Sequence, residues 1–368
     1  MSYAPNVPDH IAGLKAYIPG LPLEDLARRL SIPVKNIAKL ASNENPLGTS
    51  ERASAAMRQV AIDPSLYPDN DCTALLDVLS EALDVAPDQI VIGAGSESVL
   101  GMAAATFLSA ERSAVFTQYS FQAFVNAVQR VGAQSIEVPS PSFTVSPQAL
   151  LDAVVPNTAM IYVANPGNPT GTRVSQRDIA DFVARVPSHI IVLLDEAYVE
   201  YLPQDDGPSS LELVGQHPNL IVTRTFSKAY GLAGLRVGYG VAQPAVIAML
   251  RRLRAPFSVT AMAQAAAIAA LSDADFLART IRVNDQGLKQ LYAGFDELGL
   301  RYVRSFANFV LVDVGNGAAV AKKLEQHGLV VRPVGGYGLP AWLRISVGTE
   351  QNNNRLLVAL RAEIGEIR

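Results

Sequence analysis

Several short apolar, β-branched runs in this sequence are each followed directly by residues that can do chemistry. In an open parallel sheet, ligands bind in the crevice beyond the carboxyl ends of the strands. The residues that follow each run are therefore the first candidates for a functional site. The runs are Gln89–Ile92, Ala159–Val163, Ile190–Leu194 and Leu220–Thr223.

The first run leads into a glycine-rich turn, Gly93-Ala94-Gly95-Ser96, that opens a predicted helix. Glycine lets the backbone approach a ligand closely, and the amino end of a helix attracts an anion. Gly95 and Ser96 are thus candidates for a phosphate site. A plain turn with a serine N-cap explains the same residues and is, for this segment alone, the simpler interpretation.

The second and third runs end in polar residues with two interpretations each. Asn168 lies in a turn, Asn165–Gly171, whose two Asn-Pro steps favour rigidity, and its side chain either belongs to the turn or faces a ligand. Asp195 ends an apolar run, and a buried acid is costly unless it is paired. An N-cap role would also explain Asp195, but its place in the run favours a buried partner, with Tyr198 close by.

The fourth run is followed by Thr225, Ser227 and Lys228, and then by Arg236 in a glycine-rich loop. A solvated loop would explain a lone Ser-Lys pair, but two hydroxyls, an amine and a guanidinium together predict an anion site with an amine beside it. The strand ends thus supply a phosphate cradle, an amide, a carboxylate with a phenol, and a lysine. An enzyme that uses pyridoxal 5'-phosphate (PLP) requires this set, because a lysine binds the cofactor covalently and a carboxylate keeps its ring nitrogen protonated.

The elements that position these residues alternate between strand and helix, which predicts an α/β fold with a mostly parallel central sheet covered by helices on both faces. Residues 1–40 read as an N-terminal arm that joins the small domain, residues 41–256 as the large PLP-binding domain, and residues 257–368 as a smaller α+β domain. Further strands are expected at 114–117, 237–241, 302–304, 309–313, 330–332 and 343–346, and helices at 23–30, 97–108, 121–131, 176–186, 261–271 and 273–298.

The composition suits a large buried core, with 49% hydrophobic and 17% charged residues in a chain of 368. The net charge of -4 and the lack of a basic block argue against nucleic acid as a partner. The longest apolar stretches are too short to span a bilayer, so we predict no membrane association and a cytoplasmic protein. A single cysteine, Cys72, excludes a disulfide within the chain, and we predict no metal site.

The chain resembles the fold-type I PLP-dependent aminotransferases, and within them the histidinol-phosphate aminotransferase group, nearly end to end. The resemblance implies PLP as the cofactor, a small-molecule amino donor and 2-oxoglutarate as partners, and a homodimer with shared active sites. The motifs that carry it are AYIPG (16–20), LASNENPLG (40–48), YPD (67–69), GAGSES (93–98), NPGNPTG (165–171), DEAY (195–198), TFSKAYGLAGLRVGY (225–239) and VRPVGGYGLPAWLRISVGT (331–349).

The resemblance also implies roles for single residues. Lys228 matches the lysine that holds the cofactor and then moves the proton, and Asp195 matches the aspartate that bonds the pyridinium nitrogen. Asn168 and Tyr198 match residues that bind the 3'-oxygen of the ring, and Tyr119 matches the aromatic residue stacked on its face.

The cofactor phosphate is expected to meet a set of amides, hydroxyls and one guanidinium, and a tyrosine, Tyr67, that comes from the neighbouring subunit. Because the chain has 12 tyrosines, Tyr67 and Tyr119 could instead be ordinary core or surface residues. The set in the same subunit is Gly95, Ser96, Thr225, Ser227 and Arg236.

For the substrate, Arg344 matches the arginine that binds a carboxylate or a phosphate, and a guanidinium suits both. Arg332 stands at the place of a second arginine, although a surface residue after a strand would also explain it. Tyr17 and Asn43 match further residues of the substrate pocket.

We therefore predict transamination of L-histidinol phosphate with 2-oxoglutarate. The run Ser96-Glu97-Ser98 departs from the pattern of many members and leaves the substrate open. An aromatic amino-acid aminotransferase acting on phenylalanine or tyrosine is the main alternative, and a threonine-phosphate decarboxylase is a more distant one. A nicotinamide-dependent oxidoreductase fits less well, because the first glycine loop is not a full G-x-G-x-x-G and Lys228 would have no role.

Overall fold

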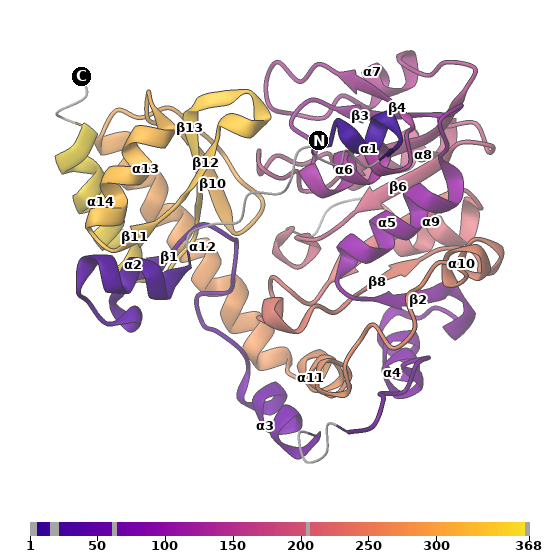
Figure 1. Cartoon of the computed structure of the whole chain (residues 1–368), viewed down its shortest axis with the longest axis horizontal. Coiled ribbons are helices and arrows are strands. Elements are labelled where there is room, and N and C mark those ends of the chain that lie inside the picture. Colours follow the sequence, from indigo (N-terminus) through magenta and orange to yellow (C-terminus); the bar gives the residue numbers. More distant parts are fainter. Residues whose placement is uncertain (1–5, 15–21, 61–64, 204–206, 365–368) are drawn as a thin grey trace.

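The computed structural model describes residues 6–14, 22–60, 65–203 and 207–364. Figure 1 shows them as two lobes with the long helix α12 (Ala274–Glu297) on the side of the smaller one. We call the part built on a seven-stranded sheet the large lobe, and the part built on a four-stranded sheet the small lobe.

The large lobe is built on a sheet with the strand order β2-β8-β7-β6-β5-β3-β4. Only β8 runs antiparallel to its two neighbours, and the other adjacent pairs are parallel. The carboxyl ends of β2, β5, β6 and β7 therefore meet at one edge, together with the start of β8. The strands are β2 (Ile90–Gly93), β3 (Ser113–Thr117), β4 (Gln134–Val138), β5 (Thr158–Ala164), β6 (Ile191–Asp195), β7 (Leu220–Thr225) and β8 (Gly238–Val241).

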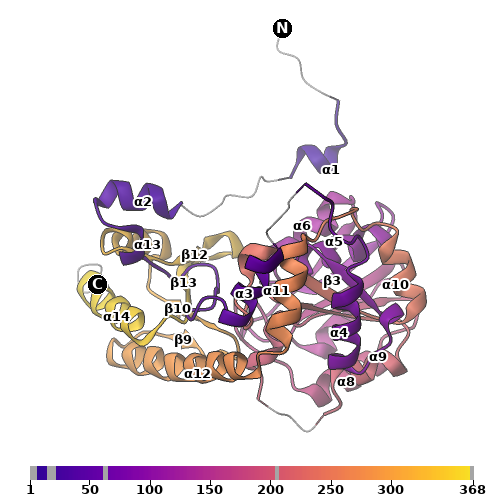
Figure 2. The same cartoon turned by 90° about the horizontal axis from the view of Figure 1, so that it is seen from below.

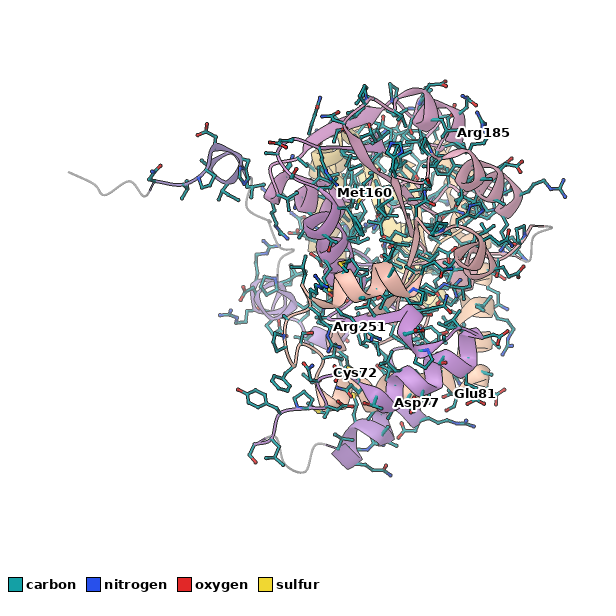
Figure 3. All side chains as sticks on the ribbon, turned by 90° about the vertical axis from the view of Figure 1, so that its right-hand side faces the viewer. Cys72, Asp77, Glu81, Met160, Arg185 and Arg251 are labelled. Atoms are coloured by element: carbon teal, nitrogen blue, oxygen red, sulfur yellow. The ribbon has the colours of Figure 1, made fainter. Side chains whose placement is uncertain are left out.

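Helices cover both faces of this sheet, which confirms the predicted α/β class. Alternate residues of β6 point to opposite sides, so that Val192 and Leu194 join one hydrophobic core and Ile191 and Leu193 join the other. Met160 is fully buried in the second core, whereas Asp77, Glu81 and Arg185 lie on the outer surfaces of helices (Figure 3). The helices are α3 (Glu51–Val60), α4 (Thr73–Leu83), α5 (Ser96–Phe107), α6 (Gln122–Arg130), α7 (Pro147–Asp152), α8 (Gln176–Arg185), α9 (Ser210–Gln216), α10 (Pro244–Arg251) and α11 (Ala261–Leu271).

The small lobe carries an antiparallel sheet in the order β12-β13-β10-β9, and α12 lies along it in Figure 2. The short strand β1 (Ala38–Lys39) pairs in parallel with β11 (Leu329–Val330), so residues near the N-terminus complete this lobe. The remaining strands and α-helices of the chain are β9 (Tyr302–Val303), β10 (Phe309–Asp313), β12 (Arg332–Val334), β13 (Leu339–Ser346), α1 (Asp9–Ala12), α2 (Leu23–Leu30), α13 (Gly317–Gln326) and α14 (Glu350–Ile364).

Two details differ from the sequence predictions. The strand β4 was not expected, because it is an edge strand with polar, largely exposed side chains and shows no apolar run. The strand expected at 330–332 is divided between β11 and β12, which pair with different partners. The alanines of α11, a helix that lies in the range predicted as the small domain, pack into the core of the large lobe. The predicted domain limits at residues 40 and 256 stay a prediction.

Among the described residues, no single helix has the length and apolar composition to cross a membrane. The helices α11 and α12 would pass that test only as a pair, and they meet at a bend of 80°.

Candidate active site

The edge of the large sheet where β2, β7 and β8 meet forms a cradle that only glycine permits. Gly93 and Thr225 are both paired with Gly238, so the turns that follow β2 and β7 lie side by side. Gly95 has φ +80°, and a Cβ there would lie 2.6 Å from a guanidinium nitrogen of Arg236. A side chain at Gly238 would likewise collide with the backbone nitrogen of Ser96. These glycines therefore bring the amino end of α5 against Arg236.

Two hydroxyls complete this cradle. The Thr225 hydroxyl donates to Ser227 Oγ at 3.0 Å, and Arg236 Nη1 donates to the same oxygen at 3.3 Å. A helix amino end, hydroxyls and a guanidinium in one place are the donors that bind a phosphate. Glu97 lies 3.8 Å from Arg236 Nη2 and offsets part of its charge.

Asp195, the last residue of β6, presents a buried carboxylate at the same edge and is 4% exposed. It accepts hydrogen bonds from the Tyr162 hydroxyl at 2.9 Å and the Thr223 hydroxyl at 3.0 Å. Burial raises the pKa of Asp195 to about 6, and these two bonds oppose the shift only in part. Both partners are neutral, so the site is suited to a cation brought by a ligand.

Lys228 follows β7 and lies in the same region. Its Nζ atom donates to the backbone oxygen of Ser42 at 3.2 Å and sits 5.9 Å from the centre of the Tyr198 ring. Burial, followed by the positive charge of Arg344, lowers the pKa of Lys228 to about 8. About a tenth of this amine is therefore neutral, and hence nucleophilic, at pH 7, far more than for an ordinary lysine.

Tyr198 lies at the centre of a hydrogen-bond network that joins the two lobes. Its hydroxyl oxygen accepts from Asn43 Nδ2 at 2.8 Å and from Asn168 Nδ2 at 3.3 Å. Arg344, from the small lobe, donates to Asn168 Oδ1 at 2.6 Å and to the backbone oxygen of Ala41 at 2.7 Å. Burial raises the pKa of Tyr198 to about 12, so this phenol stays protonated at neutral pH.

Arg332 and Arg344 are direct cross-strand partners on β12 and β13. Residues directly opposite on antiparallel strands point to the same face of the sheet. Arg344 is buried and Arg332 is half-buried, so two guanidinium groups serve one side of the small lobe.

The predicted aromatic residues fall into three different situations. Tyr119 has φ +65° and lines a narrow pocket together with Asn168, which places it at the site. Tyr67 is 81% exposed and stacks on Phe257, so it does not join the site of its own chain. Tyr17 lies outside the described residues.

The structure thus brings most of the predicted residues to one place between the lobes, and it adds partners that the sequence pattern did not indicate. Tyr162 is an interior residue of β5, and Thr223 is the cross-strand partner of Asp195 on β7. Ser346 accepts from the Asn43 backbone at 2.8 Å and donates to its side chain at 3.0 Å. These partners could be found only from the pairing of the strands, which cannot be read from the sequence.

Comparison with known proteins places this fold and site in a class. Residues 35–360 match the family described as Aminotransferase class I and II. The aspartate aminotransferase of Thermus thermophilus, solved with maleate, shares the fold at a TM-score of 0.83 with 20% identity, over 98% of this chain and 100% of that one. The chain belongs to the class I and II aminotransferases.

More similar relatives narrow the class to a group. Histidinol-phosphate aminotransferase 2 of Pseudomonas fluorescens is 45% identical over 348 residues, which is 94% of each chain. Histidinol-phosphate aminotransferase 2 of Ralstonia nicotianae is 44% identical, over 98% of this chain and 97% of its own. The structure of the Sinorhizobium meliloti histidinol-phosphate aminotransferase in complex with PLP has a TM-score of 0.88 and 30% identity, covering 98% of this chain and 97% of that one. Within its class, the chain is thus a member of the histidinol-phosphate aminotransferase group.

Proposed function

We propose that this protein is a PLP-dependent enzyme that transfers the amino group of L-histidinol phosphate to 2-oxoglutarate. The observation that carries the proposal is the cross-strand pair Arg332 and Arg344, because Arg344 bonds Asn168 of the same site and Arg332 lies on the same face of the sheet. A pair of guanidinium groups suits a dianionic phosphate, and Arg344 alone suits a carboxylate. The names of the relatives point to the same donor.

The residues fit the cofactor at both of its ends. Asp195 is a buried carboxylate with a raised pKa and neutral partners, and a protonated pyridine nitrogen would supply the missing positive charge. The glycine-walled cradle at the start of α5 would hold the phosphate. When bound, PLP supplies an electron sink for the electrons left at the substrate Cα. The phosphate would meet Gly95, Ser96, Thr225, Ser227 and Arg236.

Lys228 is the residue we assign to the covalent attachment of the cofactor and to proton movement. Its lowered pKa makes the amine both a nucleophile and, once released, a base that can take the proton from the substrate Cα and return it elsewhere. Tyr198 and Asn168 would bind the 3'-oxygen of the ring, and they are already oriented by their bond to each other. Tyr119 would stack on the ring face.

The substrate would lie between the arginine pair and Lys228. Asn43 holds Tyr198 and is itself fixed by Ser346, so it would orient the substrate end of the pocket. Because Arg344 also bonds Asn168, a substrate anion on Arg344 would be coupled directly to a residue of the cofactor site. Tyr17 would contribute from outside the described residues.

An aromatic amino-acid aminotransferase remains the second candidate, and one observation favours it. The rings of Tyr119, Phe143 and Trp342 form a continuous aromatic group, with centroids 5.5 Å and 5.0 Å apart. Such a group would accept a phenyl or phenol ring as readily as an imidazole. In that case Arg344 would bind the α-carboxylate of both substrates.

We further propose a homodimer with shared active sites, in which Tyr67 of each chain reaches the cofactor phosphate of the other. The exposure of Tyr67 supports this, because its side chain is accessible to a neighbouring subunit. We also propose that the enzyme works in the cytoplasm and uses only small-molecule substrates, without nucleic acid or membrane as a partner.

A donor screen by visible spectroscopy tests the proposed reaction. The PLP-loaded protein is mixed with histidinol phosphate, phenylalanine, tyrosine or threonine phosphate in the absence of any keto acid. A donor that transfers its amino group converts the absorbance of the cofactor to that of its amino form. Fast conversion by histidinol phosphate supports the proposal, and faster conversion by phenylalanine or tyrosine replaces it with the second candidate.

A further inference from the structure

Tyr67 and Phe257 form an exposed aromatic pair on the large lobe. Their ring centroids are 4.5 Å apart with an interplanar angle of 23°, and they remain 81% and 43% exposed. Leu66, next to Tyr67, is 77% exposed. Exposed aromatic and apolar side chains gathered in this way are typical of a surface that meets another protein surface.

Phe257 is held in a backbone conformation that a bulky residue rarely adopts. Its φ is +55°, in the left-handed region, and strain of this kind persists only where the surroundings enforce it. Asn70 Oδ1 accepts the Phe257 backbone N–H at 2.9 Å, across 187 positions of sequence. Arg254, whose side chain is only 12% exposed, donates to Asp71 at 2.8 Å, and Asn70 donates to the same carboxylate at 3.1 Å.

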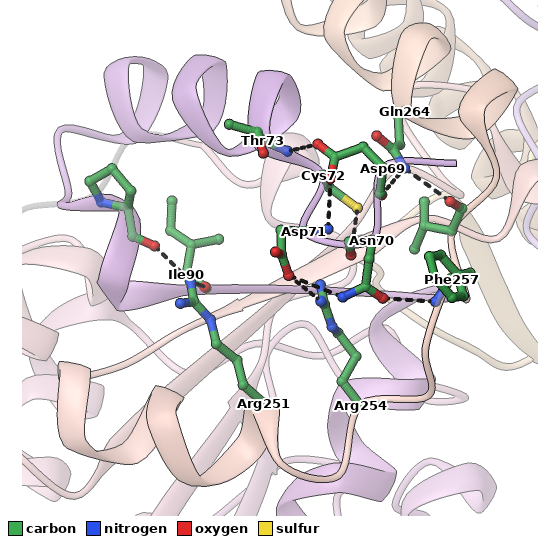
Figure 4. Close-up of polar contacts among 12 residues, drawn as sticks. Asp69, Asn70, Asp71, Cys72, Thr73, Ile90, Arg251, Arg254, Phe257 and Gln264 are labelled. Atoms are coloured by element: carbon green, nitrogen blue, oxygen red, sulfur yellow. Dashed lines mark hydrogen bonds and ion pairs between the residues drawn. The ribbon is translucent and has the colours of Figure 1, made fainter. Parts of the chain in front are cut away.

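Further contacts hold the segment that follows Tyr67, as Figure 4 shows. Gln264 Nε2 donates to the backbone oxygens of Asp69 at 2.9 Å and Val259 at 3.0 Å. The Asp69 carboxylate accepts the backbone N–H of Thr73 at 2.7 Å, which holds the pKa of Asp69 below its usual value. Side-chain contacts therefore hold together the segments that carry Tyr67 and Phe257, and each segment contributes one aromatic ring.

We propose that Phe257 is a positioning residue that seats the Tyr67 ring, so that the Tyr67 hydroxyl reaches the cofactor phosphate bound by a second copy of the chain. This inference rests on the proposed homodimer with shared sites. An exposed tyrosine beside an exposed leucine has many accessible side-chain orientations, and ordering it on association is unfavourable. Asn70 accepts the backbone N–H of Phe257, and Arg254 bonds Asp71 beside it, so the segment that carries the Phe257 ring is already fixed. Stacking on this ring would order the Tyr67 side chain before the subunits associate and so reduce that loss.

The test compares PLP affinity in Phe257→Leu, Tyr67→Phe and the double variant of the full-length protein. Phe257→Leu keeps an apolar side chain but removes the flat seat, whereas Tyr67→Phe keeps the stack but removes the hydroxyl. PLP is titrated into each cofactor-free protein by visible absorbance, and sedimentation velocity reports the assembly. We expect Tyr67→Phe to raise the Kd about tenfold and Phe257→Leu to raise it measurably, by no more than that factor.

The distinguishing result is the double variant, which should bind PLP no more weakly than Tyr67→Phe alone, with every variant dimeric. Phe257→Tyr, which keeps a flat ring, should restore the parent affinity, and Leu253→Ala, which removes another exposed apolar side chain of the same stretch, should leave it unchanged.

Three results would overturn the inference. They are an unchanged Kd in Phe257→Leu or Tyr67→Phe, additive effects in the double variant, and loss of the dimer in Phe257→Leu, which would make Phe257 an assembly contact only. The donor screen does not depend on any of them, so failure of the proposed reaction is recognised separately.

Discussion

Arg332 and Arg344 stand directly opposite each other on β12 and β13, with their side chains on the same face of the small-lobe sheet. Like charges at such positions destabilise a sheet, so the pair is better explained by an anion that binds between them than by folding stability. Arg344 is further fixed by Asn168 and the Ala41 carbonyl, whereas Arg332 is half-buried. The two residues should therefore respond differently to substitution.

Arg332→Ala should lower kcat/KM for a phosphorylated donor about 100-fold, because the bound phosphate would lose one of its two charged partners in a partly desolvated site. The same variant should change kcat/KM for 2-oxoglutarate far less, whereas Arg344→Ala should lower kcat/KM for both substrates. Steady-state kinetics with each substrate varied in turn checks this, and Arg304→Ala, on the same lobe, is the control. Equal losses of kcat/KM for both substrates in Arg332→Ala would contradict the separate roles of the two arginines.

Lys228→Ala should abolish turnover and the covalent attachment of PLP while leaving the fold intact. Proton transfer by a positioned residue contributes on the order of 10²–10⁴-fold, and the loss should be at least of that size. Borohydride reduction followed by mass spectrometry measures attachment, and circular dichroism checks the fold. Lys289→Ala, an exposed lysine of α12, should behave like the parent, and measurable turnover in Lys228→Ala would refute the assignment.

Asp195→Asn should still bind PLP but lose most of its activity. A neutral amide fits the hydroxyls of Tyr162 and Thr223 but cannot hold a positive charge on the ring nitrogen. The change from a charged to a neutral hydrogen bond should lower kcat about 10- to 100-fold. Stopped-flow absorbance of the half-reaction measures the effect, and Asp77→Asn on the surface of α4 is the matched control. Near-native rates in Asp195→Asn would refute the role of Asp195 in keeping the ring nitrogen protonated.

The principal candidate site residues could be named from the sequence because they follow strands, although their roles stay a prediction. Parallel strands bring their carboxyl ends to one edge, so Asp195, Lys228 and the residues of the phosphate cradle could be grouped before any contact was known. Gly238 shows the limit of that reasoning, since its role in the cradle depends on an antiparallel strand whose start lies at this edge.

Contacts between distant segments could not be predicted in the same way. Arg344 bonds Asn168 across 176 positions, and the seat of Tyr67 depends on Asn70 and Phe257. Neither contact follows from local periodicity or turn chemistry, because each depends on how the lobes and loops pack. The edge strand β4 was missed for a related reason, since an exposed edge needs no apolar run.

Glu200, on the short helix η3 (Val199–Tyr201), gives the protein a titrating group that the proposed reaction does not use. Its Oε2 atom is buried and has no hydrogen-bond partner among the described residues. Loss of hydration raises the pKa of Glu200 from 4.5 to about 7, with the charge of Arg224 opposing the shift and that of Glu196 adding to it. The folded state therefore holds this proton more tightly than the unfolded state does.

This carboxyl should lower the free energy of unfolding as the pH rises from 4.5 to about 7. Below that window both states are protonated, and above it the folded protein bears the full penalty of a buried charge. Because glutamine does not titrate, the stability of Glu200→Gln relative to the parent should increase by about 3 kcal/mol across the window. Urea unfolding of the holoenzyme at pH 5 and pH 8 measures the difference, with Glu81→Gln on the surface of α4 as the control. A stability difference that does not change with pH would show that Glu200 is charged throughout.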